Sequence, residues 1–493
     1  MINSEKLRLS CVWVSILLIT LFTAFLQSFR AGDEAEVVDA PVVEVDFVAP
    51  IQMQSELMGK IVIAVDGLRS IAPSMSSQQI LESAKPLCEP DAPLADRLGY
   101  SVLVGRVSGW TLGADQARAI ETESVAATTL RDDLVAVMES LAATTDAASS
   151  VDGQIDSSTD ATPPSIDVLS TQRMEAIEQS LGFFGRALGS HADEEATRTV
   201  VVIVFVALWY CVVFFSGLTA LLVLGVCLGR GAIKPRIELA HDTHTSIVLG
   251  ETFAVWMVAF LGLTIGAMLL GDLVTMLCLE EGDELPAAMR LALSIGAMFA
   301  SLLVLAYPRL RGVSFAQLRQ LIGLNTGQGL VRESLCGISC YVSAIPFLAA
   351  GLLVFMVLTM LSEALMGKQP QPSHPAVEML GGASGIEIVM LLLLASVAAP
   401  IVEEIAFRGL LYGHLRALVA PRIRLVSAVV AAVSSSFIFA AIHPQGALFV
   451  PALGGLAVGF CLYREVRGSL IAPMVAHGIN NAVTLTIGLT LLS

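Results

Sequence analysis

Charged side chains are scarce in this sequence of 493 residues. Asp, Glu, Lys and Arg together make up 15% of it, and hydrophobic residues make up 55%. Globular domains in water usually contain about a quarter charged residues. This chain instead has many apolar stretches of about 18 residues or more, each long enough to cross a bilayer as a helix. These stretches exclude a soluble protein and predict an all-α, polytopic transmembrane helical bundle.

A disulfide framework and a basic surface are also missing. Of the eight cysteines, only Cys88 lies in a polar region, and the others lie in or beside apolar segments. Cys336 and Cys340 share one helix face, where packing is favoured over a metal or redox role. The net charge is −16, and no basic cluster is present that would favour a nucleic-acid partner.

The acidity belongs to one insert, Ala31–Arg198. This insert has 28 acidic and 10 basic residues, against 16 and 18 in the rest of the chain. Apolar residues recur at helical spacing in Gly113–Ala147 and Ser170–Glu195. Between them, Ala148–Pro164 has the composition of a flexible linker, and Val37–Pro50 is expected to be extended. Because the insert has no catalytic motif, we expect a mainly helical interaction or spacer domain outside the membrane.

The N-terminal segment 1–30 contains the apolar stretch Leu9–Phe29, which follows Lys6 and Arg8. It is either a cleaved signal peptide or an uncleaved membrane anchor. The stretch is longer than the usual core of a signal peptide, and no clear small-residue cleavage site follows it. Both features favour the anchor.

Eight further membrane helices are predicted after the insert, which gives about nine in all. Residues 199–370 form a first group, and residues 384–493 form a second. The expected spans are 199–228, 247–270, 289–307, 335–363, 384–418 with a possible break near Pro400, 424–443, 446–463 and 469–491.

The loops between these helices alternate in charge. The loop after 199–228 is basic, the loop after 247–270 is acidic, and the following loops around Arg309, Arg416 and Arg464 are basic. Basic loops prefer the cytoplasm. All of them agree with a cytoplasmic N-terminus and an extracytoplasmic insert, and we expect the inner membrane of a bacterium.

Three ionisable side chains interrupt the apolar helix after Pro400. They are Glu403, Glu404 and Arg408. Charge inside a bilayer is costly and usually marks function. Glu404 and Arg408 lie one turn apart and can pair, although such a pair alone could be structural. Glu403 is rotated by about 100° from Glu404, so it has no equally close cation and is a candidate general base.

Two more helices contribute polar groups. His443 ends the apolar stretch 437–443, and His477 and Asn481 share one face of the last helix. Taken singly, His443 could cap a helix end, and His477 or Asn481 could form hydrogen bonds between helices. Their order and spacing after the two glutamates favour one shared pocket.

These residues resemble the CPBP family, the type II CAAX prenyl endopeptidases and their bacterial relatives. That family has the motifs EExxxR, FxxxH and HxxxN on successive transmembrane helices. Here they are Glu403–Glu404–xxx–Arg408, Phe439–xxx–His443 and His477–xxx–Asn481. The similarity covers about Ile386–Leu492, and the insert has no counterpart in the family core.

The resemblance implies hydrolysis of a peptide bond within the membrane. In that scheme Glu403, helped by His443, activates a water molecule. His477 and Asn481 stabilise the oxyanion, and Glu404 and Arg408 orient the first glutamate. The helix 424–443 must then be tilted or end elsewhere, because its predicted topology places His443 toward the outer face, away from Glu403.

The sequence also gives expectations for a cofactor and for partners. If a divalent metal such as zinc is bound, Glu403, His443 and His477 are its expected ligands. HExxH is absent, and a metal-independent reaction is slightly favoured. The expected partners are the lipid bilayer and a membrane-associated peptide or protein, prenylated or not. The sequence specifies no oligomeric state.

Two alternative functions are open. One is a catalytically silent membrane scaffold, immunity factor or sorting factor of the same fold. The presence of all six polar residues favours the protease over it. The other is a transporter, which is disfavoured because no internal repeat is found.

The topology can be tested by cysteine labelling in a background without the native cysteines. Because basic loops stay in the cytoplasm, Ser150→Cys should react with an impermeant maleimide in intact cells. Asn325→Cys should react only after permeabilisation. The reverse pattern at both positions would contradict the predicted topology.

Overall fold

A computed structural model describes residues 4–33, 53–70, 76–90, 92–122, 124–150, 168–189, 192–240, 242–279, 285–366, 383–418 and 424–492. Within these ranges the elements are helical and no strand occurs, which confirms the predicted all-α class. The expected extended segment Val37–Pro50 and residues 151–164 of the expected linker lie outside the described residues.

The chain divides by its internal contacts into two units. The membrane unit comprises 1–37 and 209–489, and the insert unit comprises 38–208 and 490–493. The N-terminal helix therefore groups with the membrane helices, although the acidic insert separates them in the sequence.

Eight helical segments in the described ranges are long and apolar enough to cross a membrane, so the protein is an integral membrane protein. They are α1 (Ser4–Asp33), α9 (Ala192–Gly229), α10 (Thr243–Cys278), α11 to α12 (Ala287–Leu310), α14 (Leu330–Met366), α16 to α18 (Gly385–Leu418), α19 (Arg424–Ala441) and η6 to α20 (Ala447–Arg467). The ninth predicted span is the helix α21 (Ile471–Leu492), which is not among the eight. Its polar residues His477, Asn480 and Asn481 lower its hydropathy.

The insert unit is built from short helices. These are α2 (Met53–Gly67), η1 (Leu68–Ser70), α3 (Ser77–Glu82), η2 (Lys85–Cys88), α4 (Leu94–Ser108), α5 (Trp110–Arg118), α6 (Val125–Ser150), α7 (Val168–Leu181) and α8 (Phe183–Arg186). The stretch Gly113–Ala147, which was expected to be helical, consists of two helices, because α5 ends at Arg118 and α6 begins at Val125. Ser124 marks the new start, since its hydroxyl accepts a hydrogen bond from the backbone N–H of Ala127.

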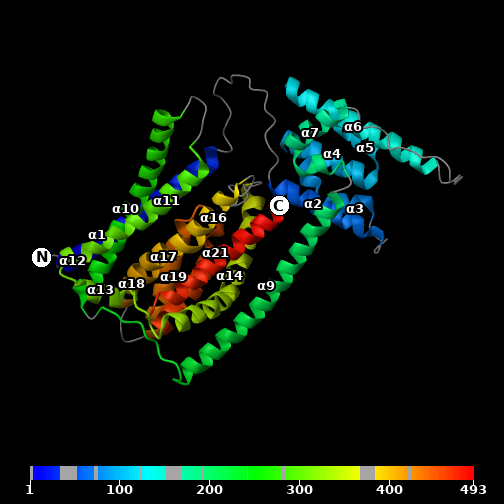
Figure 1. The fold of residues 1–493 in the computed structure, drawn as a ribbon. Helices are drawn as coiled ribbons and strands as arrows, with labels where there is room; N and C mark the ends of the chain where they lie inside the picture. Colours follow the sequence, from blue (N-terminus) through cyan, green and yellow to red (C-terminus); the bar gives the residue numbers. More distant parts are fainter. Residues whose placement is uncertain are drawn as a thin grey trace. The chain divides into compact units, whose positions relative to one another are not determined.

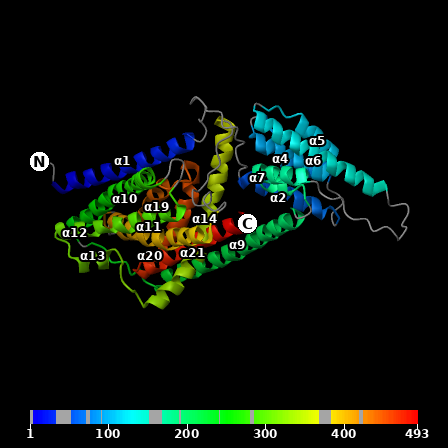
Figure 2. The same cartoon turned by 45° about the horizontal axis from the view of Figure 1, so that its top comes forward.

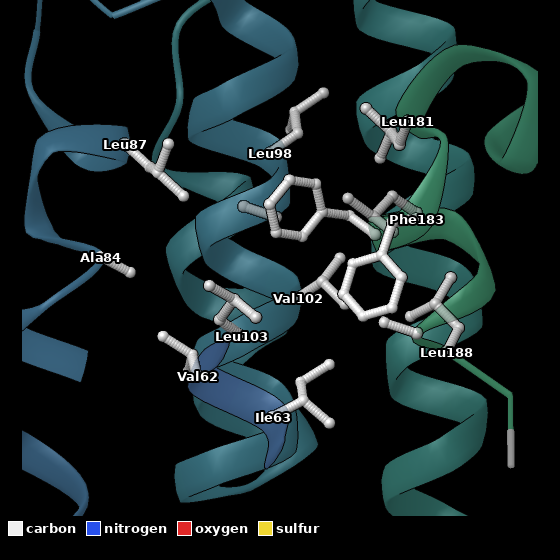
Figure 3. Close-up of a cluster of buried hydrophobic side chains, with 14 of the residues drawn as sticks. Val62, Ile63, Ala84, Leu87, Leu98, Val102, Leu103, Leu181, Phe183 and Leu188 are labelled. Atoms are coloured by element: carbon white, nitrogen blue, oxygen red, sulfur yellow. The ribbon is translucent and has the colours of Figure 1, made fainter. Parts of the chain in front are cut away.

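The core of the insert unit centres on two adjacent phenylalanines. Phe183 and Phe184 are fully buried, and they belong to one cluster with Leu98 and Val102 of α4 (Figure 3). Glycines make room for the neighbouring ring. A Cβ atom on Gly59 or Gly99 would lie 2.5 or 2.6 Å from the ring of Phe184. The helices of the insert unit therefore pack closely around these rings.

In the membrane unit, the segment α16 to α18 lies among other helices. Its later part contacts α10, α19 and α20, and Figure 1 shows α18 between α10 and α19. The helix α1 packs along α10, as Figure 2 also shows, and Arg8 binds Glu251 at 2.8 Å. Residues 398–416 of this segment are mostly buried, which places Glu404 and Arg408 in the interior of the unit.

The segment α16 to α18 does not break at Pro400. Two π-helical turns, η4 (Leu394–Ala398) and η5 (Ile405–Leu411), flank the α-helical turn α17 (Ala399–Glu404). A π-helical turn shifts the backbone hydrogen bond from four to five residues, and proline lacks the N–H that an α-helix would use. The chain therefore passes Pro400 as a continuous helix in which both glutamates lie between two π-helical turns.

The packing of the insert unit predicts the effect of removing one ring. Phe184→Ala should destabilise this unit by about 3–5 kcal/mol, the usual cost of a large cavity in a core. Hydrogen exchange followed by mass spectrometry should therefore become faster in α2 and α4. Leu112→Ala, at an exposed position, is the matched control. Unchanged exchange in Phe184→Ala would show that this ring does not hold the unit together.

Candidate active site

Glu404 and Arg408 form a buried ion pair. Arg408 Nη1 donates to Glu404 Oε1 at 2.8 Å, and the two side chains are 1% and 0% exposed. The guanidinium also lies over the rings of Phe439 and Phe460, 4.5 and 5.3 Å from their centroids. Cation–π attraction of this kind is strongest where water is excluded. The predicted pairing across one helical turn is present, and residues from α19 and α20 enclose it.

His477 joins this pair from α21. Its Nδ1 lies 3.0 Å from Glu404 Oε1, and its ring stacks on Phe460 with the centroids 5.6 Å apart. An ionised carboxylate can only accept a hydrogen bond, so Nδ1–H is the donor. Glu404 thereby fixes the orientation of the imidazole and directs Nε2 elsewhere. That atom lies 3.8 Å from Glu403 Oε2.

His443 approaches Glu403 from another element. The helix α19 ends at Ala441, two residues before the predicted end, and His443 lies in the turn that follows. Its Nδ1 lies 2.6 Å from the carbonyl oxygen of Phe439, so Nδ1–H donates and Nε2 is the ring nitrogen that carries no proton in the neutral imidazole. His443 Nε2 lies 3.8 Å from Glu403 Oε2. The early end of α19 thus brings together two residues that the predicted span kept apart.

Glu403 Oε2 therefore faces the Nε2 atoms of two histidines. This oxygen is buried and has no hydrogen-bond partner among the described residues. The distances of 3.8 Å exceed those of direct hydrogen bonds. The Glu403 carboxylate and the unprotonated Nε2 of His443 are both acceptors, so they cannot bond to each other directly. A water molecule can donate to both, and this arrangement can therefore hold and polarise water.

Asn481 stabilises the first π-helical turn. The N–H of Ala399 bonds to Leu394 O across η4, so it is not available to Ala395 O as in an α-helix. The next donor in π-helical spacing would be Pro400, which has no N–H. Asn481 Nδ2 supplies the missing donor to Ala395 O at 2.8 Å. The amide thus replaces a backbone donor, and its second N–H remains for another partner.

The approach of α21 to this turn depends on Gly478. A Cβ atom at this position would lie 2.5 Å from Ser396 O, closer than real contacts allow. Asn480 adds a hydrogen bond from its Nδ2 to Asn481 Oδ1 at 3.2 Å, which orients the neighbouring amide. Sequence reasoning named neither Gly478 nor Asn480. Their only signal was the position of both beside His477 and Asn481.

A second buried polar cluster fixes the other end of the segment to α20. Arg416 pairs with Glu465 at 2.7 Å, and Tyr412 donates to the same carboxylate at 2.9 Å. Arg464 is fully buried and donates to the carbonyl oxygens of Arg408 and Leu321. These arginines looked like the basic ends of membrane helices in the sequence. In the structure they hold η5 and α18 against their neighbours.

A metal site was also expected as one option, with Glu403, His443 and His477 as ligands. In the ranges that the structure describes, no group of three His, Cys, Asp or Glu side chains is arranged to hold a metal ion. The separations of 3.8 Å from Glu403 Oε2 exceed the edge of a zinc tetrahedron, which is about 3.3 Å for bonds of about 2.0 Å. The donor atoms suit zinc chemically, but their spacing does not fit it.

Comparison with known proteins supports the assignment of these helices. Residues 385–483 match the Rce1-like type II CAAX prenyl endopeptidase family, and this stretch contains all six polar residues of the site. This match confirms the resemblance inferred from the motifs. No curated protein and no solved structure matches the chain.

The role assigned to Asn481 leads to a test by double substitution. Asn481→Ala leaves Ala395 O without a donor and should lower the free energy of unfolding by about 1–3 kcal/mol. Pro400→Ala restores a backbone N–H nearby and should recover part of that loss in the double variant. Thermal unfolding in detergent measures both effects. Thr484→Ala, at an exposed position of the same helix, is the control.

Additive effects of Asn481→Ala and Pro400→Ala would contradict this role. If the double variant were more stable than Asn481→Ala but had no higher turnover, Asn481 would also contact the reacting group. The departure of the double variant from additive stability therefore measures the interaction between Asn481 and the backbone at Pro400.

Proposed function

We propose, from the place of residues 385–483 in the type II CAAX prenyl endopeptidase family, that this membrane protein is an intramembrane endopeptidase. Its substrate would be a membrane-associated peptide or protein, and the reaction would be hydrolysis of one peptide bond. The observation that carries the proposal is the buried Glu403 oxygen that faces the Nε2 atoms of His443 and His477.

In the proposed reaction, Glu403 and His443 bind one water molecule between them. Glu403 removes a proton from this water as its oxygen attacks the carbonyl carbon of the substrate. A C–O bond forms and the carbonyl oxygen becomes an oxyanion. The C–N bond then breaks, and Glu403 returns the proton to the leaving amine. The protein ends the cycle in its starting protonation state.

The oxyanion would be stabilised from α21. In its doubly protonated form, His477 offers Nε2–H, and the second amide N–H of Asn481 is the other donor. Donors fixed in advance in a site without bulk water stabilise developing charge effectively. Glu404 would act as a positioning residue, because its bond to His477 Nδ1 sets the direction of Nε2. Arg408 would neutralise Glu404 and keep it in place.

We further propose the inner membrane of a bacterium as the location, with the N-terminus in the cytoplasm and residues 31–198 outside. The alternation of basic and acidic loops supports this orientation. The insert unit would then serve as an extracytoplasmic interaction or spacer domain. It has its own hydrophobic core, and no residue of the six-residue site lies in it.

The two glutamates should respond differently to substitution. Glu403→Gln keeps size and polarity but removes the base, so turnover should fall by about 100-fold or more with little change in the melting temperature. Glu404→Ala strands Arg408 in a buried setting, which costs about 3–5 kcal/mol, and should lower stability and turnover together. Glu363→Gln, at an exposed glutamate of α14, is the control.

Single-turnover assays would use two internally quenched peptides in detergent micelles. One carries a farnesylated C-terminal CAAX sequence, and the other carries an apolar helix without a lipid. His443→Ala should resemble Glu403→Gln, and the double variant should lose little more, since both act on one water. Dialysis against a chelator should leave turnover unchanged. Normal turnover in Glu403→Gln would exclude Glu403 as the base.

A further inference from the structure

A cavity of about 380 Å³ lies in the membrane unit and shares no residue with the Glu403 site. Its walls come from the segment after α9, from α13 (Phe315–Leu321) and the turn after it, and from the turn between α20 and α21. The lining residues are Arg236, Glu238, Ala316, Arg319, Gln320, Asn325, Arg467 and Gly468. The volume is within the range of small-molecule sites.

The cavity has an excess of positive charge. Arg467 is bound by Glu333 at 2.6 Å, and Glu238 accepts a hydrogen bond from Gln320 at 3.1 Å. Arg236 and Arg319 are exposed, and neither guanidinium makes a hydrogen bond or ion pair within the described ranges, although Arg236 is close enough to Glu333 for the two charges to attract each other. Two cationic groups therefore line one cavity, and the one acidic side chain in its lining is already engaged.

The backbone around the cavity is held in place. The N–H of Arg236 donates to Glu465 O at 2.9 Å. Gly468 has a positive φ of 70°, and a Cβ atom there would lie 2.5 Å from Arg236 O. Glycine at the end of α20 thus lets the segment after α9 pass directly over the turn. Asn325 also bonds to Gly468 O, from Nδ2 at 3.4 Å.

The cavity lies where several membrane helices begin or end. The helix α9 ends at Gly229, α14 begins at Leu330, α20 ends at Arg467 and α21 begins at Ile471. Phospholipid phosphates lie at the same level of a bilayer, where basic side chains attract anionic lipids. Arginine suits phosphate because its planar N–H groups match two oxygens at once.

We propose that this cavity binds a phosphate group through Arg236 and Arg319. The group belongs to the head of an anionic phospholipid or to free phosphate, and the chemistry of recognition is the same for both. A simpler account is that the two arginines only add to the positive charge of a cytoplasmic loop. That account gives no special role to these two positions over other basic residues of the same loops.

The test uses the purified full chain in neutral detergent and measures its melting temperature. Phosphatidylglycerol, phosphatidylcholine and inorganic phosphate are titrated separately. We expect a saturable rise with phosphatidylglycerol that phosphatidylcholine does not give. Arg236→Gln with Arg319→Gln should require tenfold or more lipid for the same rise, since each basic group contributes substantially to anionic-lipid binding. Both side chains are exposed and make no hydrogen bond or ion pair within the described ranges, so the unliganded melting temperature should change little.

The matched control is Lys234→Gln with Arg332→Gln, which removes the same charge from exposed positions outside the cavity lining. It should keep the response of the unsubstituted protein. An equal rise with inorganic phosphate, also lost in the cavity variant, would support the site and assign it to the free anion. Equal losses in both double variants, or no saturable rise with either phosphate compound, would overturn the proposal.

Discussion

The buried ion pair between Glu404 and Arg408 constrains the surrounding structure. Two charges taken out of water are costly unless they are paired and their remaining donors and acceptors are satisfied. Glu404 Oε1 accepts hydrogen bonds from Arg408 and from His477 Nδ1, and the guanidinium lies over Phe439 and Phe460. Glu404 Oε2 and Arg408 Nη2 are buried without a hydrogen-bond partner among the described residues, so this pairing carries most of the compensation. The pair thereby fixes α19, α20 and α21 around one point of the segment α16 to α18. Glu403 is adjacent in sequence and is left facing two imidazoles.

The irregular backbone of this segment follows from the same arrangement. Proline at 400 removes one backbone donor, and the π-helical turn η4 shifts another away from Ala395 O. Asn481 supplies the replacement from a different helix, and Gly478 permits the close approach. Irregular backbone within a membrane is tolerated where it is covered by protein and its polar groups are satisfied. The two π-helical turns around Glu403 and Glu404 meet that condition through long-range contacts.

Local features of the site could be predicted from the sequence. Glu404 and Arg408 are one turn apart, so their pairing needs only helical geometry. The helical class and most membrane spans follow from hydropathy alone. The π-helical turn η4 could not be predicted, because Ala395 O in it is satisfied by Asn481, which is distant in the sequence. The turn that brings His443 to Glu403 was missed for a different reason. Apolar residues continue to Ile442, so hydropathy does not show that α19 ends at Ala441.

The central claim is that Glu403 activates water and does not itself attack the substrate. A single turnover in water enriched in oxygen-18 tests this directly, with mass spectrometry of both the product and the protein. The account predicts one heavy oxygen in the new carboxylate of the cleaved peptide and none in the protein peptide that contains Glu403. Heavy oxygen in the Glu403 carboxylate would indicate a covalent acyl intermediate on that residue and would contradict the account.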